Sequence, residues 1–114
     1  MTSLGSTTHE WTLAQLTELE SLFARRYQTL ALLCLYQGGP MRWAEIARAM
    51  HRRATEHIHD KEITHSLNAL ETAGLLQRRT LNNNCQVREL IPTGTRRAQR
   101  ITEIVTVVAF AIPE

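Results

Sequence analysis

The amino-acid sequence predicts a mainly α-helical protein with one small β-hairpin. In five segments, apolar residues recur at intervals of three or four positions, which is the period of an amphipathic α-helix. Two short strand-like segments flank Asn82-Asn83-Asn84, a cluster typical of turns because asparagine tolerates left-handed backbone angles. The chain has 114 residues, which fits one small domain better than two. We therefore expect residues 1–114 to form a single domain.

The charge of this domain is distributed unevenly although its net value is only +2. Residues 1–24 carry a net charge of −3, residues 25–100 carry +7 and residues 101–114 carry −2. Nearly all of the basic residues are arginine, which favours bidentate contacts with phosphate and guanine, although a codon bias towards arginine would give the same excess. If the protein binds a polyanion, we expect the central segment to do so.

The sequence also predicts a cytoplasmic protein without a membrane-spanning segment. Its longest apolar stretches, 29–36 and 104–112, are shorter than the roughly 18 residues that a spanning helix needs. The first residues lack the basic start and apolar run of a secretory signal. Two cysteines, Cys34 and Cys85, are too few for a disulfide framework, which favours a reducing compartment.

We expect a flexible N-terminus over residues 1–11, followed by N-terminal helices over 12–37. Thr12 is a plausible N-cap, and an apolar stripe continues from there to Cys34. This stripe is compatible with two helices, about 12–24 and 27–37, or with one bent helix. Gly38-Gly39-Pro40 should end it, because glycine suits a left-handed C-cap and proline cannot continue a helix.

Residues 41–74 then predict a helix-turn-helix. A short helix lies within 41–50, and the polar residues 51–59 form a connection without a clear period. Asp60 is expected to cap the next helix by accepting hydrogen bonds from its first amides, and Gly74 is expected to end it.

A β-hairpin, the wing, is predicted over 75–91, and a C-terminal helix over 93–112. A three-helix unit that carries a hairpin is a winged helix-turn-helix, here with additional N- and C-terminal helices. The core is expected from the inward periodic positions, which are Leu30, Leu33, Trp43, Ile46, Ile63, Leu67, Leu70 and Leu75.

Three segments of this sequence resemble the HxlR-type branch of the MarR-like winged-helix transcription regulators. GGPMRWAEIARAM is similar to the family's entry into the first helix of the helix-turn-helix. EITHSLNALETAGLLQRR is similar to its recognition helix and first wing strand, and LIPTG is similar to the start of its last helix. The resemblance covers residues 27–101 and implies a homodimer that binds operator DNA, without catalysis or a cofactor. The reactive N-terminal cysteine of the redox-sensing members has no counterpart here.

Candidate DNA-binding residues follow from the helix and strand periods. Lys61, Thr64, His65 and Asn68 share one helical face opposite Ile63, and such a face can enter a major groove, where asparagine pairs with adenine and threonine meets a thymine methyl group. A solvated polar face would show the same pattern. The predicted phosphate contacts are Arg42, Arg48, Arg79 and Arg88. Strand alternation places Arg78 and Arg79 on opposite faces, and we favour Arg79 for DNA.

Other chemistries are less well supported. His51, His57, His59 and His65 lie close in sequence, but no complete zinc-ligand pattern is present, so we expect no metal site. No phosphate-binding loop, nucleophile elbow or paired-carboxylate signature predicts an enzyme. Cys34 fits a small core residue, whereas Cys85 is the better candidate for an exposed thiol.

Two apolar, acid-bearing end segments predict a homodimer, because surplus apolar surface is usually covered by a partner. The expected interface residues are Leu13, Leu16, Leu19, Phe23, Ile101, Ile104, Val105, Val108 and Ile112. Packing of these segments onto the helix at 27–37 is the alternative. Two functions follow: a sequence-specific regulator that binds double-stranded DNA at a near-palindromic operator, or a winged-helix protein-interaction module that has lost DNA binding.

Overall fold

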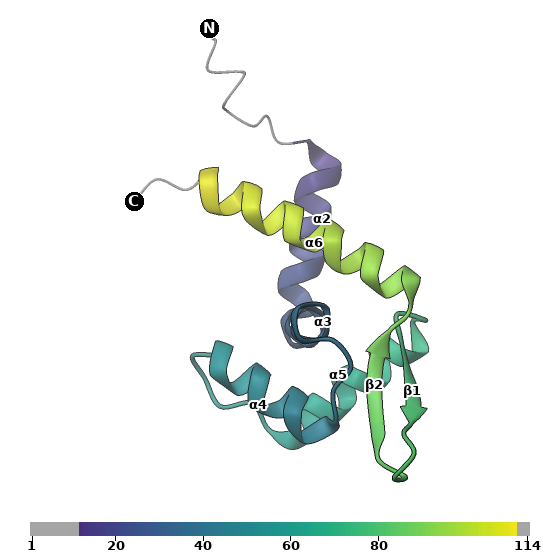
Figure 1. Ribbon diagram of the computed structural model, residues 1–114. Coiled ribbons are helices and arrows are strands. Elements are labelled where there is room, and N and C mark those ends of the chain that lie inside the picture. Colours follow the sequence, from purple (N-terminus) through teal and green to yellow (C-terminus); the bar gives the residue numbers. More distant parts are fainter. Residues whose placement is uncertain (1–11, 112–114) are drawn as a thin grey trace, which may run out of the picture.

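The computed structural model describes residues 12–111, and the side chains of residues 12–106 within that range. The predicted flexible segment 1–11, Ile112 and the side chain of Val108 lie outside this description. In chain order the elements are α2 (Leu13–Ala24), α3 (Arg26–Gly38), α4 (Trp43–Arg53), α5 (Asp60–Thr72), β1 (Leu76–Thr80), β2 (Gln86–Leu90) and α6 (Pro92–Ala111). This mainly helical architecture with one antiparallel hairpin confirms the predicted fold class (Figure 1).

The N-terminal helices are two and not one bent helix. Thr12 caps α2 as predicted: its hydroxyl accepts a hydrogen bond from the Gln15 N–H at 3.1 Å, and the Gln15 side chain accepts one from the Thr12 N–H at 2.9 Å. Arg25 leaves helical geometry with φ −119° and ψ 42°, which separates α2 from α3. The predicted glycine stop is confirmed at Gly39, which has φ 77° and donates its N–H to Leu35 O.

The predicted connection 51–59 is wrong in its first three residues, because α4 continues through Arg53. Three basic residues in this last turn suit the negative end of the helix dipole, which explains why a polar stretch stays helical. The connection 54–59 also contributes a residue to the core, which its polar composition did not predict. Ile58 is fully buried and anchors the connection to the domain.

Helix α5 begins with a different cap from the one predicted. His59 is the N-cap residue and Asp60 is the first helical residue, so Asp60 supplies a negative charge to the first turn and does not cap the helix with its side chain. The predicted end at Gly74 is confirmed. Gly74 has φ 77°, its N–H donates to Glu71 O, and the Leu75 N–H donates to Leu70 O, which together form a Schellman motif.

The hairpin pairs Leu76 with Leu90 at its base and Thr80 with Gln86 near its tip. At the predicted turn, Asn84 adopts φ 63° and its N–H donates to Leu81 O at 3.0 Å. Met41 adds a short third segment, because its backbone N–H and C=O both pair with Arg88. This bridge fixes β2 to the start of α4.

Helix α6 begins one residue before the predicted position, at Pro92, which is well suited to the first helical turn. Close packing explains the glycine that follows. A Cβ atom at Gly94 would overlap the backbone carbonyl of Leu75, so α6 can lie against the base of the hairpin only with glycine there.

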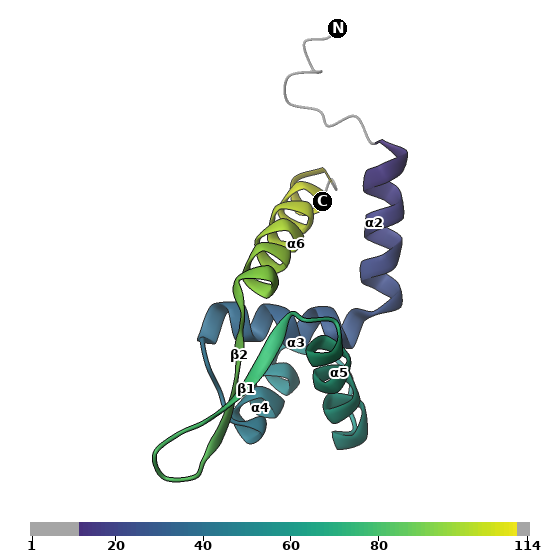
Figure 2. The same cartoon turned by 90° about the vertical axis from the view of Figure 1, so that its right-hand side faces the viewer.

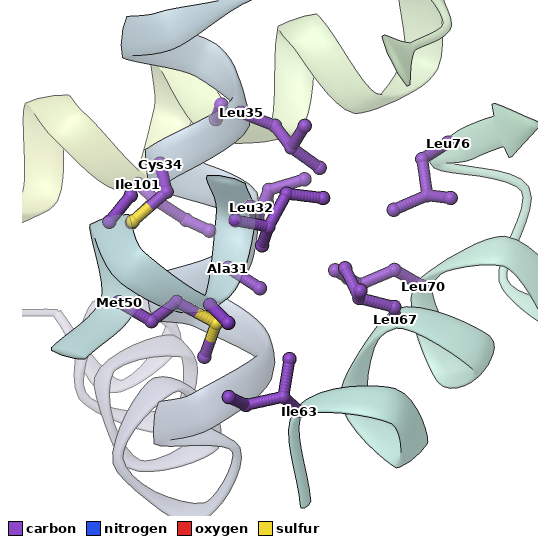
Figure 3. Close-up of a cluster of buried hydrophobic side chains, with 14 of the residues drawn as sticks. Ala31, Leu32, Cys34, Leu35, Met50, Ile63, Leu67, Leu70, Leu76 and Ile101 are labelled. Atoms are coloured by element: carbon purple, nitrogen blue, oxygen red, sulfur yellow. The ribbon is translucent and has the colours of Figure 1, made fainter. Parts of the chain in front are cut away.

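One hydrophobic core joins these elements (Figure 3). Side chains from α3, α4, α5, β1 and α6 converge in it, including Leu32, Met50, Leu67, Leu76 and Ile101. The fully buried positions on the predicted core list are Ile46, Ile63 and Leu67, with Leu70 almost as deeply buried.

The core prediction is wrong in its choice of face on α3. Leu30 and Leu33 are only half-buried, and the buried positions are Ala31, Leu32, Cys34 and Leu35. Cys34 lies in the core as predicted, whereas the break at Arg25 interrupts the stripe that was predicted to bury Leu30 and Leu33. Trp43 and Leu75 are likewise half-buried at the edge of the core, and Leu76 is the buried residue at the start of the hairpin.

The other elements form two groups on opposite sides of α3. Figure 2 shows α4, α5 and the hairpin on one side, and α2 and α6 rising from the other. Arg100 connects the two rising helices by an ion pair with Glu18 at 3.3 Å. This arrangement separates the basic helix-turn-helix from the apolar terminal helices. In the part of the chain that the structure describes, no helix is both long and apolar enough to cross a bilayer.

We expect Leu67→Ala to lower the free energy of unfolding by about 2–5 kcal/mol, because it leaves a cavity in the core. Leu81→Ala, at an exposed leucine next to the hairpin turn, is the matched control and should change stability by less than about 1 kcal/mol. Urea denaturation followed by circular dichroism measures both. Equal losses would show that α5 does not bury the face described above.

Glu45 gives a prediction about pH, because its carboxylate stabilises the start of α4. The Arg42 N–H donates to Glu45 Oε1 at 2.8 Å, and this hydrogen bond, together with the Arg42 guanidinium, lowers the pKa of Glu45 despite partial desolvation. A lowered pKa in the folded state adds stability above the unfolded-state pKa, and that stability is lost as the pH falls through the folded-state value.

Glu45→Gln should therefore lower the Tm at neutral pH, and the difference should shrink between about pH 5 and pH 3. Glu20→Gln, on the exposed side of α2, is the control. A Tm difference for Glu45→Gln that is independent of pH would contradict the prediction.

Candidate nucleic-acid interface

Helix α5 presents an exposed polar face on a rigid base. Ile63, Leu67 and Leu70 fix its opposite face in the core, and α3 packs along it. As the sequence predicts, the exposed side chains are Lys61, Thr64, His65 and Asn68. The helix is therefore free to enter a groove of DNA without disturbing the core.

Two of these side chains are held by neighbouring elements. The indole N–H of Trp43, on α4, donates to Thr64 Oγ1 at 3.1 Å. Arg78, on β1, donates from Nη2 to Asn68 Oδ1 at 3.2 Å. The same guanidinium forms an ion pair with Glu71 through Nε at 3.0 Å. Thus α4 and the hairpin both restrict the rotamers that α5 presents.

The wing arginines differ in their surroundings. Arg79, which the sequence favours for a phosphate contact, lies on the hairpin face opposite to that of Arg78 and pairs with Glu89 at 2.9 Å while half of its side chain stays exposed. Arg78 lies on the face that also carries Leu76, and it contacts α5. The separation of these two residues onto opposite faces agrees with strand alternation.

Arg88 has a less exposed position than a phosphate-binding residue usually has. It lies directly across the hairpin from Arg78, and its Nε atom is buried without a hydrogen-bond partner among the described residues. Desolvation lowers the pKa of Arg88, repulsion from Arg78 lowers it further, and Glu71 opposes the shift. Arg88 is therefore partly desolvated on the hairpin face that also carries Arg78.

The remaining phosphate candidates lie on α4. Arg48 is exposed, and so is Arg42 at the start of the helix. Arg42 contacts the Cys85 side chain and Glu45, and these two contacts raise its pKa above the ordinary value. Arg52 and Arg53 are also exposed on the last turn of α4. Four exposed arginines therefore lie on α4 and at its N-cap.

A second group of basic residues, beside the start of α5, could not be predicted from the sequence. A hollow of about 500 Å³ lies beside the first turn of α5, and its lining includes Arg25, Arg26, Lys61 and His65. Arg26 is held there by Glu56 at 3.5 Å, and Glu56 also accepts a hydrogen bond from the Tyr27 hydroxyl at 2.6 Å. Arg25 and Arg26 are adjacent basic residues in the sequence, but only the fold brings them next to α5.

The histidines order the connection before α5. The His51 ring nitrogen lies 2.9 Å from Ile58 O, His51 stacks on His57 at 5.6 Å, and His57 meets His59 edge-on at 4.9 Å. Over residues 12–111, no group of three or more histidine, cysteine or acidic side chains is placed to hold a metal ion. Of the two cysteines, Cys34 is buried, which raises the pKa of its thiol, and Cys85 is partly exposed.

An apolar surface lies on the side of α3 opposite α4, α5 and the hairpin (Figure 2). The exposed large hydrophobic residues there are Leu13, Leu16, Phe23 and Val105, with exposed fractions from 43% to 80%. Between α2, α3 and α6 the surface forms a cavity of about 310 Å³, which Leu19, Phe23, Leu30, Leu33 and Val105 help to line. Ile101 and Ile104, which the sequence also assigned to a dimer interface, are buried within the protomer against its own core. They are therefore not available to a partner.

The fold is similar to that of a solved regulator. MepR, a transcription regulator of the Staphylococcus aureus multidrug efflux pump MepA, superposes with a TM-score of 0.58 over 91% of this chain and 87% of its own, at 17% sequence identity. The likeness shows a shared winged-helix fold. No protein-family model matches the sequence, and the comparison with curated proteins gives no significant match.

Proposed function

We propose that this protein is a sequence-specific DNA-binding transcription regulator of the MarR-like class, acting as a homodimer in the cytoplasm on a near-palindromic operator. One observation carries the proposal: a winged-helix fold presents the exposed polar face of α5 between a basic α4 and a hairpin that carries arginines. The similarity in fold to a transcription regulator supports it. The resemblance of the three sequence segments to HxlR-type regulators makes that branch the narrower proposal, and no catalysis or cofactor is part of it. One core shared by the described helices and the hairpin supports the proposal of a single domain, whose bounds of 1–114 remain proposed from the sequence.

In this proposal α5 enters the major groove, which is wide enough for a helix. Lys61, Thr64, His65 and Asn68 face the base edges. The phosphates on either side of α5 are contacted by Arg42 and Arg48 of the α4 region and by Arg79 of the hairpin. Arg88 adds positive charge to the hairpin. Arg25 and Arg26 extend the phosphate contacts beyond the first turn of α5, because they share a hollow with Lys61. These positive groups explain why the central segment of the chain carries a net charge of +7.

The dimer follows from the apolar surface on α2 and α6. Leu13, Leu16, Leu19, Phe23 and Val105 form its exposed or half-exposed part, and Val108 and Ile112 remain proposed from the sequence. This surface lies on the opposite side of α3 from α5, so a two-fold dimer built on it leaves both α5 helices free (Figure 2). The half-sites should then be separated by about 10 base pairs or a multiple of that spacing.

One observation favours the alternative, a protein-interaction module. Arg78 and Arg79 are both paired with glutamates of the same domain, which reduces the free positive charge of the wing. Binding to DNA separates the two functions directly.

We expect salt-dependent binding to a pool of random-sequence DNA duplexes in a mobility-shift titration. Arg48→Ala should weaken binding to all sequences and lower the slope of log affinity against log salt by about one, because one phosphate contact is lost. Arg96→Ala, at an exposed position on α6, removes the same charge away from α5 and should leave the slope unchanged. Absence of salt-dependent binding to any duplex would favour the interaction module.

Sedimentation velocity should show a dimer at micromolar concentration. Phe23→Asp places a charge on the apolar surface of α2, where the phenylalanine is 67% exposed in the protomer, so it should give a monomer that keeps its helical circular dichroism. Leu81→Asp changes an exposed leucine near the hairpin turn in the same way and should remain dimeric. A wild-type protein that sediments as a monomer would rule out the proposed dimer.

A further inference from the structure

Three of the four candidate base-reading side chains of α5 share a chemical property that their sequence does not reveal. Thr64 Oγ1 already accepts a hydrogen bond from the Trp43 indole at 3.1 Å. A hydroxyl has one hydrogen to donate, and this hydrogen is still available when the oxygen accepts from the protein. Thr64 is exposed, so its O–H can donate to a group outside the protein.

Asn68 is oriented in a similar way by the wing. Arg78 donates to its Oδ1 at 3.2 Å, and the ion pair with Glu71 at 3.0 Å keeps the guanidinium in place. Arg88 lies across the hairpin from Arg78, so a second positive charge lies on this face of the wing. These charges favour the oxygen end of the amide towards the hairpin, which leaves the two N–H donors of Nδ2 at the other end of the amide.

Lys61 completes the set, one helical turn before Thr64. Its ammonium group has three donors and no acceptor. Lys61, Thr64 and Asn68 all lie on the exposed face of α5. At three positions along this face, the groups free to act on a ligand are therefore hydrogen-bond donors.

We propose that α5 reads base edges through hydrogen-bond donors alone, so that the base contacted by Asn68 in each half-site is the guanine of a G·C pair. This inference rests on the proposed DNA-binding function. In the major groove guanine offers two adjacent acceptors, O6 and N7, whereas adenine offers N7 beside an amino donor, thymine offers O4 alone and cytosine offers an amino donor. The common pairing of asparagine with adenine uses Oδ1 as an acceptor as well as Nδ2 as a donor. Arg78 engages that oxygen, which shifts the preference of Asn68 from adenine to guanine. Thr64, whose oxygen accepts from Trp43, is likewise left with a donor for an acceptor on a neighbouring base.

Trp43 and Arg78 act in this proposal as positioning residues. Neither needs to contact a base, because each acts through the oxygen atom of its partner on α5. A change at either residue should therefore alter which base is selected, an effect that a purely structural role would not produce.

Selection of bound duplexes from a random pool, followed by sequencing, tests the inference. The full-length wild-type protein is compared with Asn68→Asp, which keeps the shape of the side chain and replaces its donor end by an acceptor. With the half-site read in the same orientation, the position contacted by Asn68 should change from guanine to cytosine, whose amino group can donate to a carboxylate. Affinity for the wild-type site should fall about 5- to 150-fold, the equivalent of one bidentate base contact. Gln99→Glu adds the same charge at an exposed position of α6 and should select the wild-type motif.

Trp43→Phe gives a second, independent test. It keeps an aromatic ring at the edge of the core and removes the indole N–H that engages Thr64. The Thr64 oxygen can then also accept from an amino group, so base selectivity should weaken about fivefold or more at a different base pair from the one that Asn68→Asp changes. Thermal melting of the variant verifies that it is folded during the selection.

The outcomes separate this inference from the function on which it rests. A wild-type motif with an A·T pair at the position that responds to Asn68→Asp would overturn the inference and leave DNA binding in place. An unchanged motif for Asn68→Asp would overturn it too. A pool with no enriched motif and no salt-dependent binding would instead overturn the proposed function.

Discussion

Burial of α3 is the constraint on which the rest of the structure depends. This helix packs against α2, α4, α5, α6 and β2, and it contributes Ala31, Leu32, Cys34 and Leu35 to the core. Because the apolar side chains of α3 pack against these elements, its position constrains theirs. The face of α5 that points to solvent is thus determined by how Ile63 and Leu67 meet α3 (Figure 3). A DNA-reading surface could not keep a constant shape on an element that lacked such support.

The same helix separates two surfaces of different chemistry. On one side lie α4, α5 and the hairpin, which carry arginines and polar side chains. On the other side lie α2 and α6, whose exposed residues include Leu13, Phe23 and Val105. Positive charge suits contact with a phosphate backbone, whereas exposed apolar area suits contact with another apolar surface. The separation lets the proposed dimer contact and the proposed DNA contact exist together without competing for one face.

The hairpin and α5 are connected by polar contacts as well as by the core. Arg78 bridges Asn68 and Glu71 of α5, and Met41 joins β2 to the start of α4 through paired backbone hydrogen bonds. These contacts are partly exposed, so each adds little to stability. Their larger effect is on orientation, because they restrict the side chains that face outward from α5. Arg88, partly buried and opposite Arg78, shows that this junction keeps positive charge despite the cost of desolvation.

The sequence by itself determined the elements and most of their ends, because helix periodicity, the Thr12 cap, the left-handed glycines at 39 and 74 and the asparagine turn all act within a few residues along the chain. It also placed Lys61, Thr64, His65 and Asn68 on one exposed face, since that follows from the helical period alone. Only the tertiary structure decided the buried face of α3, the burial of Ile58 and the approach of Arg25-Arg26 to α5. It likewise decided the partners of Thr64 and Asn68, and the burial of Ile101 and Ile104 inside the protomer. These features depend on contacts between residues distant in sequence, and a single break in the helix at Arg25 is enough to change which residues meet.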